Sequence, residues 1–271
     1  MRKSLTVMIL LALLLSVFPQ ATAQVAAAAG TSWLDESNVD KGSIGIRYEV
    51  KSGVDTRLVV AKDGKNYTYA LRASQTEEWF ALQLGNGDYT ITLLENVSGT
   101  NKYRAVQTGK VTLNLSDSSL VYLNSIQNID WSSNSKAVKK ALELTKGAKT
   151  DTEKVTAVYN YIVANISYDH QLAAKVTNDY LPQIDRTFNS QKDICYGYAA
   201  LMAGMLRSLD IPAKMVTGKA SDVSNYHAWN EVYLDGKWIT IDTTLDAGLK
   251  NSKKAGKMIK DSSRYTAAKV Y

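Results

Sequence analysis

The amino-acid sequence predicts an α+β protein in which a small antiparallel β-sandwich precedes a domain of helices and strands. From about residue 32 to residue 115, apolar residues alternate with polar ones, which is typical of half-buried strands. Turn signals recur there about every ten residues, as in small all-β domains. Beyond residue 135, apolar residues follow the three- and four-residue spacing of amphipathic helices. This change of period predicts the order of the two domains.

Residues 1–23 are typical of a secretory signal peptide. Arg2 and Lys3 give a positive start, and Leu5–Phe18 is an uncharged stretch that is too short to span a bilayer. Ala21-Thr22-Ala23 fits the small-residue cleavage site, so the mature chain is expected to begin at Gln24. The alternative is an uncleaved anchoring helix. We therefore expect a secreted, extracellular protein without a stable membrane anchor.

Residues 24–116 are expected to form the β-sandwich. Asp63-Gly64 favours a two-residue hairpin turn, which would place Val60 opposite Tyr67. No cluster of thiol, imidazole and carboxylate groups occurs in this part of the sequence, so we interpret it as a structural or binding module. The residues that alternate toward its expected core are Ile44, Ile46, Tyr48, Val50, Phe80, Leu82, Leu84, Tyr89, Ile91, Leu93, Tyr103, Ala105, Val111, Leu113 and Leu115.

Two helices are expected at the start of the second domain. Residues 117–135 are rich in Ser, Asn and Asp, which indicates a linker, and residues 136–271 would form the second domain. Ser135 is a candidate N-cap for a helix that runs through Leu144 and stops at Gly147. A capping box at Thr150–Glu153 predicts the next helix. The expected buried face of that helix consists of Val155, Val158, Tyr159, Ile162 and Ile166.

Cys195 is the only cysteine in the chain and is expected in the first turn of a helix, after an irregular stretch from Asp169 to Ile194. The helix would end before Pro212, because the residue before a proline disfavours helix. Free N–H groups in a first turn favour a thiolate and can donate to an oxyanion. Asp193 is the predicted N-cap. The apolar stripe of this helix consists of Cys195, Ala199, Met202, Leu206 and Leu209.

A β-hairpin is expected to bring a histidine and an aspartate together. Asp235-Gly236 favours a two-residue loop, which would place Trp229 opposite Asp242 and His227 opposite Thr244. His227 would then be a diagonal neighbour of Asp242 on one face, about 7–8 Å away at the backbone and within reach of a hydrogen bond. The opposite face would be apolar and buried, with Ala228, Val232, Leu234, Ile239 and Ile241.

Cys195, His227 and Asp242 together suggest an activated nucleophile. Each residue also has an ordinary interpretation: a buried cysteine that packs as a small apolar residue, a histidine satisfied inside a core, and an aspartate that forms a turn. Their occurrence within about fifty residues, in the geometry that nucleophilic catalysis uses, favours the catalytic interpretation. His170 lacks such partners and is expected on the surface or in a cleft lining.

We expect no metal and no other cofactor. Two histidines and one cysteine are too few for a zinc site. No segment of the sequence resembles a calcium-binding loop.

Several segments resemble the transglutaminase-like superfamily, which groups papain-like cysteine enzymes. The matching segments are Ile166–Asp169, Cys195–Ala199, Ile211–Gly218, His227–Val232, Gly236–Trp238 and Ile241–Asp242. The resemblance covers roughly residues 150 to 246 and keeps the family's order of Cys, His and Asp. It implies a papain-like core in which Cys195 is the nucleophile, His227 the base and acid, and Asp242 the residue that orients His227.

The sequence departs from the family pattern at three places. Asp193 stands where the family usually has a glycine two residues before the cysteine, and Asp210 replaces a glycine before Ile-Pro. The family's Asp-Pro-Thr is here Asp242-Thr243-Thr244. None of these changes removes a member of the expected triad. The change at Asp193 bears on the environment of the thiol.

The expected function is that of a cysteine acyl-transfer enzyme acting on peptide or protein amide bonds through a thioester. Attack on the thioester by an amine would give transamidation, and attack by water would give hydrolysis; the sequence leaves both open. Gln183 and Gln191 are unassigned candidates for a side chain that helps bind the oxyanion. The alternative is a non-catalytic protein on the same fold that binds peptide or cell-wall polymer.

The charge of the chain bears on its partners. The net charge of +6 is mildly basic, which would favour anionic cell-wall polymers. We expect no nucleic-acid partner. Basic residues of the C-terminal segment could grip an anionic polymer or form an ordinary solvated surface. These residues are Lys250, Lys253, Lys254, Lys257, Lys260, Arg264 and Lys269. We expect a protein or peptide substrate.

Overall fold

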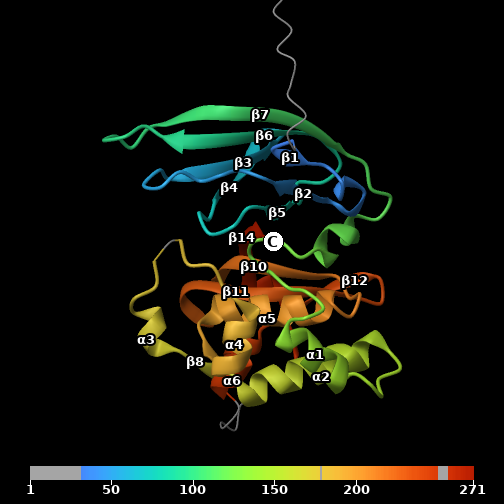
Figure 1. Cartoon of the computed structure of the whole chain (residues 1–271). Helices are drawn as coiled ribbons and strands as arrows, with labels where there is room; N and C mark the ends of the chain where they lie inside the picture. Colours follow the sequence, from blue (N-terminus) through green and yellow to red (C-terminus); the bar gives the residue numbers. More distant parts are fainter. Residues whose placement is uncertain (1–31, 178, 250–255) are drawn as a thin grey trace, which may run out of the picture. The chain divides into compact units, whose positions relative to one another are not determined.

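Two antiparallel sheets form the N-terminal part of the protein. We describe a computed structural model, which covers residues 32–271 except 178 and 250–255; the predicted signal peptide therefore lies outside the described residues. One sheet has the strand order β1-β2-β5, with β1 Leu34–Asp35, β2 Ser43–Ile46 and β5 Glu78–Ala81. The other has the order β4-β3-β6-β7, with β3 Thr56–Lys62, β4 Lys65–Ala70, β6 Gly87–Asn96 and β7 Tyr103–Leu113. Figure 1 shows the strands of both sheets in blue to green.

The expected sandwich core and its first hairpin are confirmed. Val60 pairs with Tyr67 across the Asp63-Gly64 turn. Both turn residues have positive φ, 50° and 73°, as the tight hairpin turn that matches the twist of its strands requires. The inward side chains of β3 and β6 are fully buried.

Two parts of the alternation prediction are wrong. β2 ends at Ile46, and Tyr48 lies beyond it with its hydroxyl donating to Glu95 Oε1 at 2.8 Å. Tyr103 and Ala105 belong to β7 but are exposed. The reason is an irregularity in the pairing of β6 with β7 at Leu93/Leu94, which shifts the register of the two strands. Beyond that point, the residues of β7 that continue the alternation face away from the core.

The segment between the sandwich and the helices is packed. It contains a short 3-10 helix, η2 Ser118–Leu123, and the buried side chains of Val121, Ile126 and Ile129. These side chains belong to one continuous apolar cluster that includes residues of the sandwich and of the helices that follow. Apolar contact therefore runs without a break from one part of the protein into the other.

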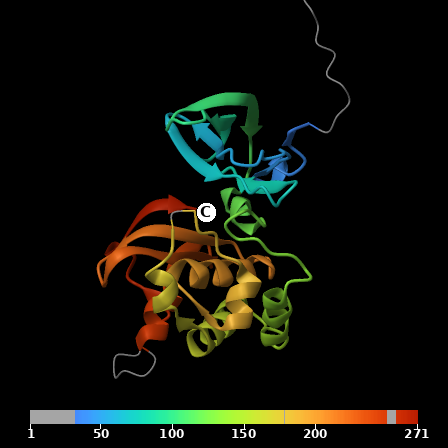
Figure 2. The same ribbon diagram turned by 60° about the vertical axis from the view of Figure 1, so that its left-hand side comes forward.

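The C-terminal part is a five-stranded antiparallel sheet with helices packed against it (Figure 2). The strand order is β13-β12-β11-β10-β14, with β10 Ala213–Ala220, β11 Val223–Leu234, β12 Lys237–Ile241, β13 Ile259–Lys260 and β14 Tyr265–Val270. The helices are α1 Lys136–Leu144, α2 Asp151–Asn165, α3 His170–Ala173, α4 Ile184–Ser190, α5 Cys195–Arg207 and α6 Thr243–Leu249. Helix α5 lies against β10 and β11, and α1, α2 and α4 contact α5. The predicted α+β fold class with a preceding sandwich is therefore confirmed.

The two predicted helices before the cysteine are present. The capping box at Thr150 and Glu153 forms as expected, and the predicted inner face of α2 is buried. Helix α1 begins after Ser135, but the Ser135 side chain makes no capping bond; Asp185 of α4 accepts from the N–H groups of Lys136 and Ala137 instead. Helix α1 runs through Leu144, as predicted, with Thr145 as its C-cap, and Gly147 lies beyond it.

The stretch before Cys195 is more regular than predicted. It contains α3 and α4 together with two short strands, β8 Ser167–Tyr168 and β9 Lys192–Asp193, which pair in parallel. These elements are too short to show a hydrophobic period, so the sequence pattern alone did not reveal them. In the part of the chain that the structure describes, no helix is long and apolar enough to cross a membrane.

Arg207, at the end of α5, is a buried cation bound by backbone carbonyls. Its guanidinium donates to the carbonyl oxygens of Ala213 at 2.9 Å, Asn124 at 2.6 Å and Tyr271 at 2.9 Å. Burial lowers the pKa of Arg207 to about 9. One side chain thus joins α5, the segment after the sandwich, and the residue that follows β14.

Candidate active site

Cys195 is the first residue of α5, as predicted, and its side chain is partly exposed. The first N–H groups of a helix have no acceptor within the helix, so they are available to a ligand or reaction intermediate at this end. Asn230 of β11 fixes α5 to the sheet, because its Nδ2 donates to the carbonyl of Ala199 at 2.9 Å and to that of Lys214 at 3.0 Å. The thiol is therefore held at a defined place relative to β11.

Asp193 does not cap α5, contrary to prediction. The N-cap is Ile194, and Asp193 is fully buried beside the helix. Oδ1 of Asp193 accepts from the Tyr180 hydroxyl at 2.7 Å, and Oδ2 accepts from Arg186 Nη2 at 2.7 Å and from Thr187 Oγ1 at 2.6 Å. The guanidinium of Arg186 and these hydrogen bonds compensate the negative charge of Asp193. The carboxylate therefore fixes Tyr180, Arg186 and Thr187 beside α5 and does not cap the helix.

His227 and Asp242 are hydrogen-bonded. His227 Nε2 lies 2.8 Å from Asp242 Oδ2, and both side chains are buried, with 4% and 0% of their surfaces exposed. The two-residue loop at Asp235-Gly236 is present with the predicted register, in which Asn230 pairs with Ile241.

The exact position of Asp242 differs from the prediction. Strand β12 ends at Ile241, and Thr243 and Thr244 begin α6, so Thr244 has no place opposite His227. Asp242 lies at the junction, where Oδ1 accepts from the N–H of Leu245 at 2.9 Å. The carboxylate therefore holds the start of α6 with one oxygen and the imidazole with the other.

The environment of His227 favours its protonated form. Burial by itself would lower the pKa of His227. The hydrogen bond to Asp242 and the contact with the thiol of Cys195 outweigh burial and raise the pKa to about 9. His227 is therefore an imidazolium at neutral pH, bound to Asp242 through Nε2 and next to the only thiol of the chain.

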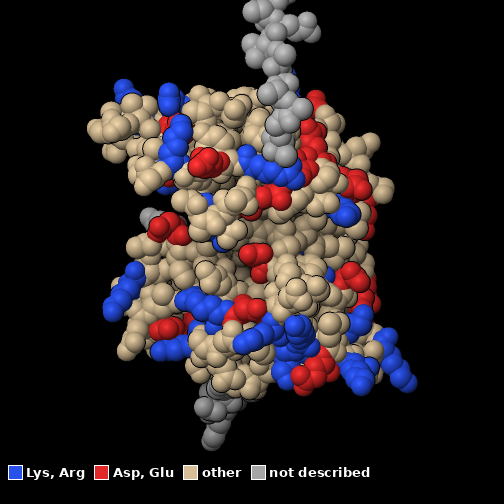
Figure 3. Space-filling view, in the orientation of Figure 1, with Lys and Arg blue, Asp and Glu red and all other residues tan. Residues whose placement is uncertain are grey.

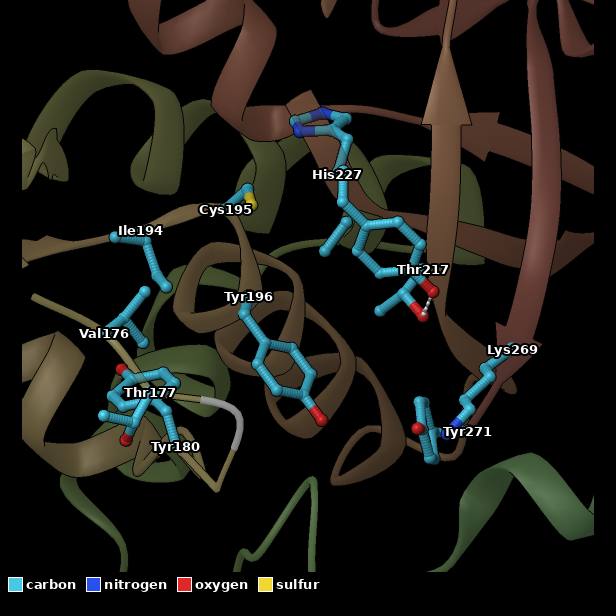
Figure 4. A pocket seen from close by; sticks show the side chains of 12 residues that line it. Val176, Thr177, Tyr180, Ile194, Cys195, Tyr196, Thr217, His227, Lys269 and Tyr271 are labelled. Atoms are coloured by element: carbon cyan, nitrogen blue, oxygen red, sulfur yellow. Dashed lines mark hydrogen bonds between the residues drawn. The ribbon is translucent and has the colours of Figure 1, made fainter. Parts of the chain in front are cut away.

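A pocket of about 400 Å³ opens on the thiol. Figure 4 shows Cys195 and His227 at one end of this pocket, with a ring nitrogen of His227 on the side of Cys195. Lys269 and Tyr271 lie at the other end, and the ring of Tyr196 lies between. The complete lining is Val176, Thr177, Tyr180, Ile194, Cys195, Tyr196, Thr217, Tyr226, His227, Ala228, Lys269 and Tyr271. A peptide amide placed here would have a thiol and an imidazolium beside its carbonyl group.

Tyr265 of β14 is a site residue that the sequence did not reveal. Its hydroxyl lies 3.1 Å from Asp242 Oδ2, the same oxygen that binds His227. Burial and the neighbouring Asp242 raise the pKa of Tyr265, so the phenol stays protonated and acts as a donor. Its strand follows the hairpin after residues 250–255, and no motif marks it; only the pairing of β14 with β10 places it here.

The other residues that the sequence singled out, two glutamines and His170, lie outside the lining of the pocket at the thiol. Gln183 and Gln191 are the cap residues of α4, and neither lines the pocket. His170 packs edge-on against Tyr168 with ring centroids 5.0 Å apart. Burial and the Cys195 thiol raise the pKa of Tyr168.

No metal cluster is evident within the described ranges, and the C-terminal basic residues differ in their contacts. No three His, Cys, Asp or Glu side chains gather there to hold a metal ion. Two of the C-terminal basic residues are engaged, Lys260 with Asp246 at 2.6 Å and Arg264 with Asp222. Lys250, Lys253 and Lys254 lie outside the described residues. Figure 3 shows basic side chains over the helical part of the protein, interspersed with acidic ones.

Comparisons with known proteins point to one family. Residues 138–243 match the model of the transglutaminase-like superfamily. Kyphoscoliosis peptidase of Mus musculus is 30% identical over 142 residues, which are 47% of this chain and 21% of that protein. The Homo sapiens protein is 32% identical over 117 residues, or 40% of this chain and 18% of that protein. The matched part thus spans about a fifth of the length of these relatives.

The comparison with solved structures gives matches of low sequence identity. A Cytophaga hutchinsonii protein, named as a candidate cysteine protease, is 17% identical with a TM-score of 0.44. The match covers 85% of this chain and 81% of that one.

Proposed function

Because residues 138–243 match the model of the transglutaminase-like superfamily, we propose that this protein is a cysteine acyl-transfer enzyme acting on peptide or protein amide bonds. Cys195 is the nucleophile, His227 the acid and base, and Asp242 the residue that orients His227. One observation carries the proposal: the 2.8 Å bond from His227 Nε2 to Asp242 leaves the other ring nitrogen free for the thiol that lines the same pocket.

The first step forms a thioester. Sγ of the Cys195 thiolate attacks the amide carbonyl carbon, and the C=O electron pair moves to oxygen. N–H groups in the first turn of α5 stabilise the oxyanion. The oxyanion then collapses, the C–N bond breaks, and the protonated His227 gives its proton to the leaving amine. Cys195 now carries the acyl group, and His227 is neutral.

The second step releases the acyl group. An amine or a water molecule attacks the thioester carbonyl while His227 takes up the proton that the attacking group loses. The C–S bond breaks and the thiolate–imidazolium pair returns. An amine gives a new amide, and water gives a carboxylic acid. Which acceptor prevails depends on its access to the thioester and on the exclusion of water.

The test uses an unstructured, glutamine-containing protein such as casein, with a fluorescent primary amine present or absent. Transamidation would incorporate the amine, and hydrolysis would release new amino groups or ammonia. The proposal expects one of these products from the wild-type chain and none from Cys195→Ala. Equal turnover by both chains would exclude this mechanism, and no turnover together with retained casein binding would favour the binding-protein alternative.

Export belongs to the same proposal. The support is the signal-like pattern of residues 1–23, with its small-residue site at Ala21-Thr22-Ala23. Mass spectrometry of the protein recovered from the culture medium should give an N-terminus at Gln24. Recovery of full-length chain from the cells only would argue against it.

A further inference from the structure

A second cavity shares part of its lining with the pocket at the thiol. That cavity, of about 570 Å³, shares Tyr180, Tyr196, Lys269 and Tyr271 with the first. Strands β3 and β4 of the sandwich supply part of its wall, including Arg57 and Thr68. Each cavity is in the size range that buries a ligand of several residues or a drug-sized molecule.

The wall where the cavities meet is rigid and aromatic. The Tyr196 hydroxyl accepts a hydrogen bond of 2.6 Å from Asn128 Nδ2. The ring of Tyr271 packs edge-on against Tyr67 of β4 at 5.8 Å, and the Tyr67 hydroxyl accepts from the N–H of Val270 at 3.0 Å. These contacts join β4 to the end of β14, so the sandwich takes part in shaping the cleft that leads to Cys195.

Lys269 is the cation at this junction. It lines both cavities, is exposed, and has no ion-pair partner among the described residues. Arg57, in contrast, is held by Asp55 through two bonds of 2.7 Å. Asp179 also lines the second cavity but not the first. An unpaired ammonium beside the tyrosines that both cavities share is a recognition element for an anionic group.

We propose that the two cavities form one cleft for an extended polypeptide, and that Lys269 selects substrates with an acidic side chain a few residues from the amide that Cys195 attacks. The proposal rests on the proposed function, because it defines the substrate of that same thiol. An extended chain advances about 3.3 Å per residue, so a peptide of six residues spans about 20 Å. Tyrosine side chains suit such a chain, because each offers an apolar ring and a polar tip.

The probe is a set of six-residue peptides with an N-terminal bromoacetyl group. Glu, Gln or Lys occupies alternate positions, and bromoacetamide is the short reagent without a peptide. Sγ of Cys195 displaces bromide and forms a C–S bond, so the labelling rate reports binding without requiring turnover. In the wild-type chain, the Glu peptide should label Cys195 on the order of fivefold faster than the Lys peptide, the size of a single exposed ion pair.

Charge reversal tests the role of Lys269. In Lys269→Glu the preference should invert, and in Lys269→Gln it should disappear. Lys219→Glu is the matched control, because Lys219 is an exposed lysine of the neighbouring strand β10 and lines neither cavity. Both reversals change the net charge equally, so long-range attraction changes equally in both. Equal rates for the three peptides, or the same response in both reversal variants, would overturn the proposal.

A second pair of variants tests the sandwich end of the cleft. Thr68 is exposed on β4 and lines the second cavity, so Thr68→Trp should obstruct it and slow labelling by all peptides while leaving bromoacetamide unaffected. Thr90→Trp places the same side chain at an exposed position of β6, away from both cavities, and should change neither rate. Unchanged peptide labelling in Thr68→Trp would show that the sandwich does not contribute to the substrate site.

The failures of the two proposals differ. Labelling of Cys195 with the expected charge preference, without turnover of casein, would support the peptide cleft and reject the proposed enzymatic activity. Turnover of casein through Cys195, with labelling rates that do not depend on peptide charge, would support the enzymatic activity and reject the role of Lys269 in substrate selection.

Discussion

Asp193 occupies the space that a side chain at Gly197 would need. A Cβ atom built on Gly197 would lie 2.6 Å from Cβ of Asp193 and closer still to its carboxyl group. Asp193 cannot withdraw easily, because Arg186, Thr187 and Tyr180 hold its carboxylate. The glycine two residues after Cys195 and the aspartate two residues before it are therefore a complementary pair.

Gly197→Ala should destabilise the protein. The added methyl group must displace a buried, hydrogen-bonded carboxylate, and such overpacking costs about 1–3 kcal/mol. Urea unfolding measures the change. Gly248→Ala is the matched control, because Gly248 lies in α6 with open space around it and should gain about 0.5–1 kcal/mol from helix propensity. A Gly197→Ala chain as stable as the wild type would contradict the packing described for Asp193.

Asp242→Asn should impair activity strongly and also lower the stability of the fold, because it removes the carboxylate from a buried ion pair. The amide is neutral and can present its NH₂ group to His227, so the protonated imidazole loses the acceptor that orients it. A loss on the order of 10²- to 10⁴-fold in kcat/KM is expected, as when the carboxylate of a catalytic triad is replaced. The measurement is the casein assay with thermal unfolding alongside. Asp222→Asn, at a surface ion pair with Arg264, should leave both quantities nearly unchanged.

Tyr265→Phe should have a smaller effect of a different kind. The phenol positions Asp242, and loss of one such hydrogen bond corresponds to about 1 kcal/mol, or roughly a fivefold fall in kcat/KM. Asp242 would then interact more strongly with His227, so the pKa of the imidazolium should rise, and the alkaline limb of the pH–rate profile should move to higher pH. Tyr159→Phe removes a comparable buried bond, the one to Asp246 at 2.8 Å, and should not move that limb.

Protein stability should depend on pH through His227. Its pKa is raised from an ordinary 6.5 to about 9, so the imidazolium–carboxylate pair contributes fully below pH 6.5. That contribution is lost as pH rises through about 9. The free energy of unfolding should therefore decrease between pH 6.5 and 9.5 in the wild type, and less so in His227→Gln. Parallel curves for the two proteins would show that His227 is not preferentially protonated in the folded state.

The sequence predicted those parts of the site that local rules determine. A two-residue turn with positive φ at Asp235 and Gly236 fixes hairpin register, so the approach of His227 to Asp242 could be argued from residue numbers alone. The helix that begins at Cys195 and the capping box of α2 were also foreseeable, because a few neighbouring residues specify each of them.

The remainder depends on contacts distant in sequence. The end of β12 at Ile241 follows from the capping of α6 by Asp242, which strand alternation does not reveal. Asp193 was predicted to be a helix cap because its partners, Arg186 and Tyr180, come from a stretch without a hydrophobic period. Tyr265 reaches Asp242 only through the pairing of β14 with β10. Such tertiary partners leave no short-range signal.

The buried guanidinium of Arg207 has a consequence for how the protein melts. Its three carbonyl acceptors belong to Asn124, Ala213 and Tyr271, which lie far apart in the chain. If any of these three carbonyl groups moves away, the buried guanidinium loses a hydrogen-bond acceptor. A buried charge without compensating partners is costly in free energy. The sandwich, the strand that supplies Lys269 and Tyr265, and the helix that carries the thiol should therefore lose their structure in a single cooperative transition, rather than one after another.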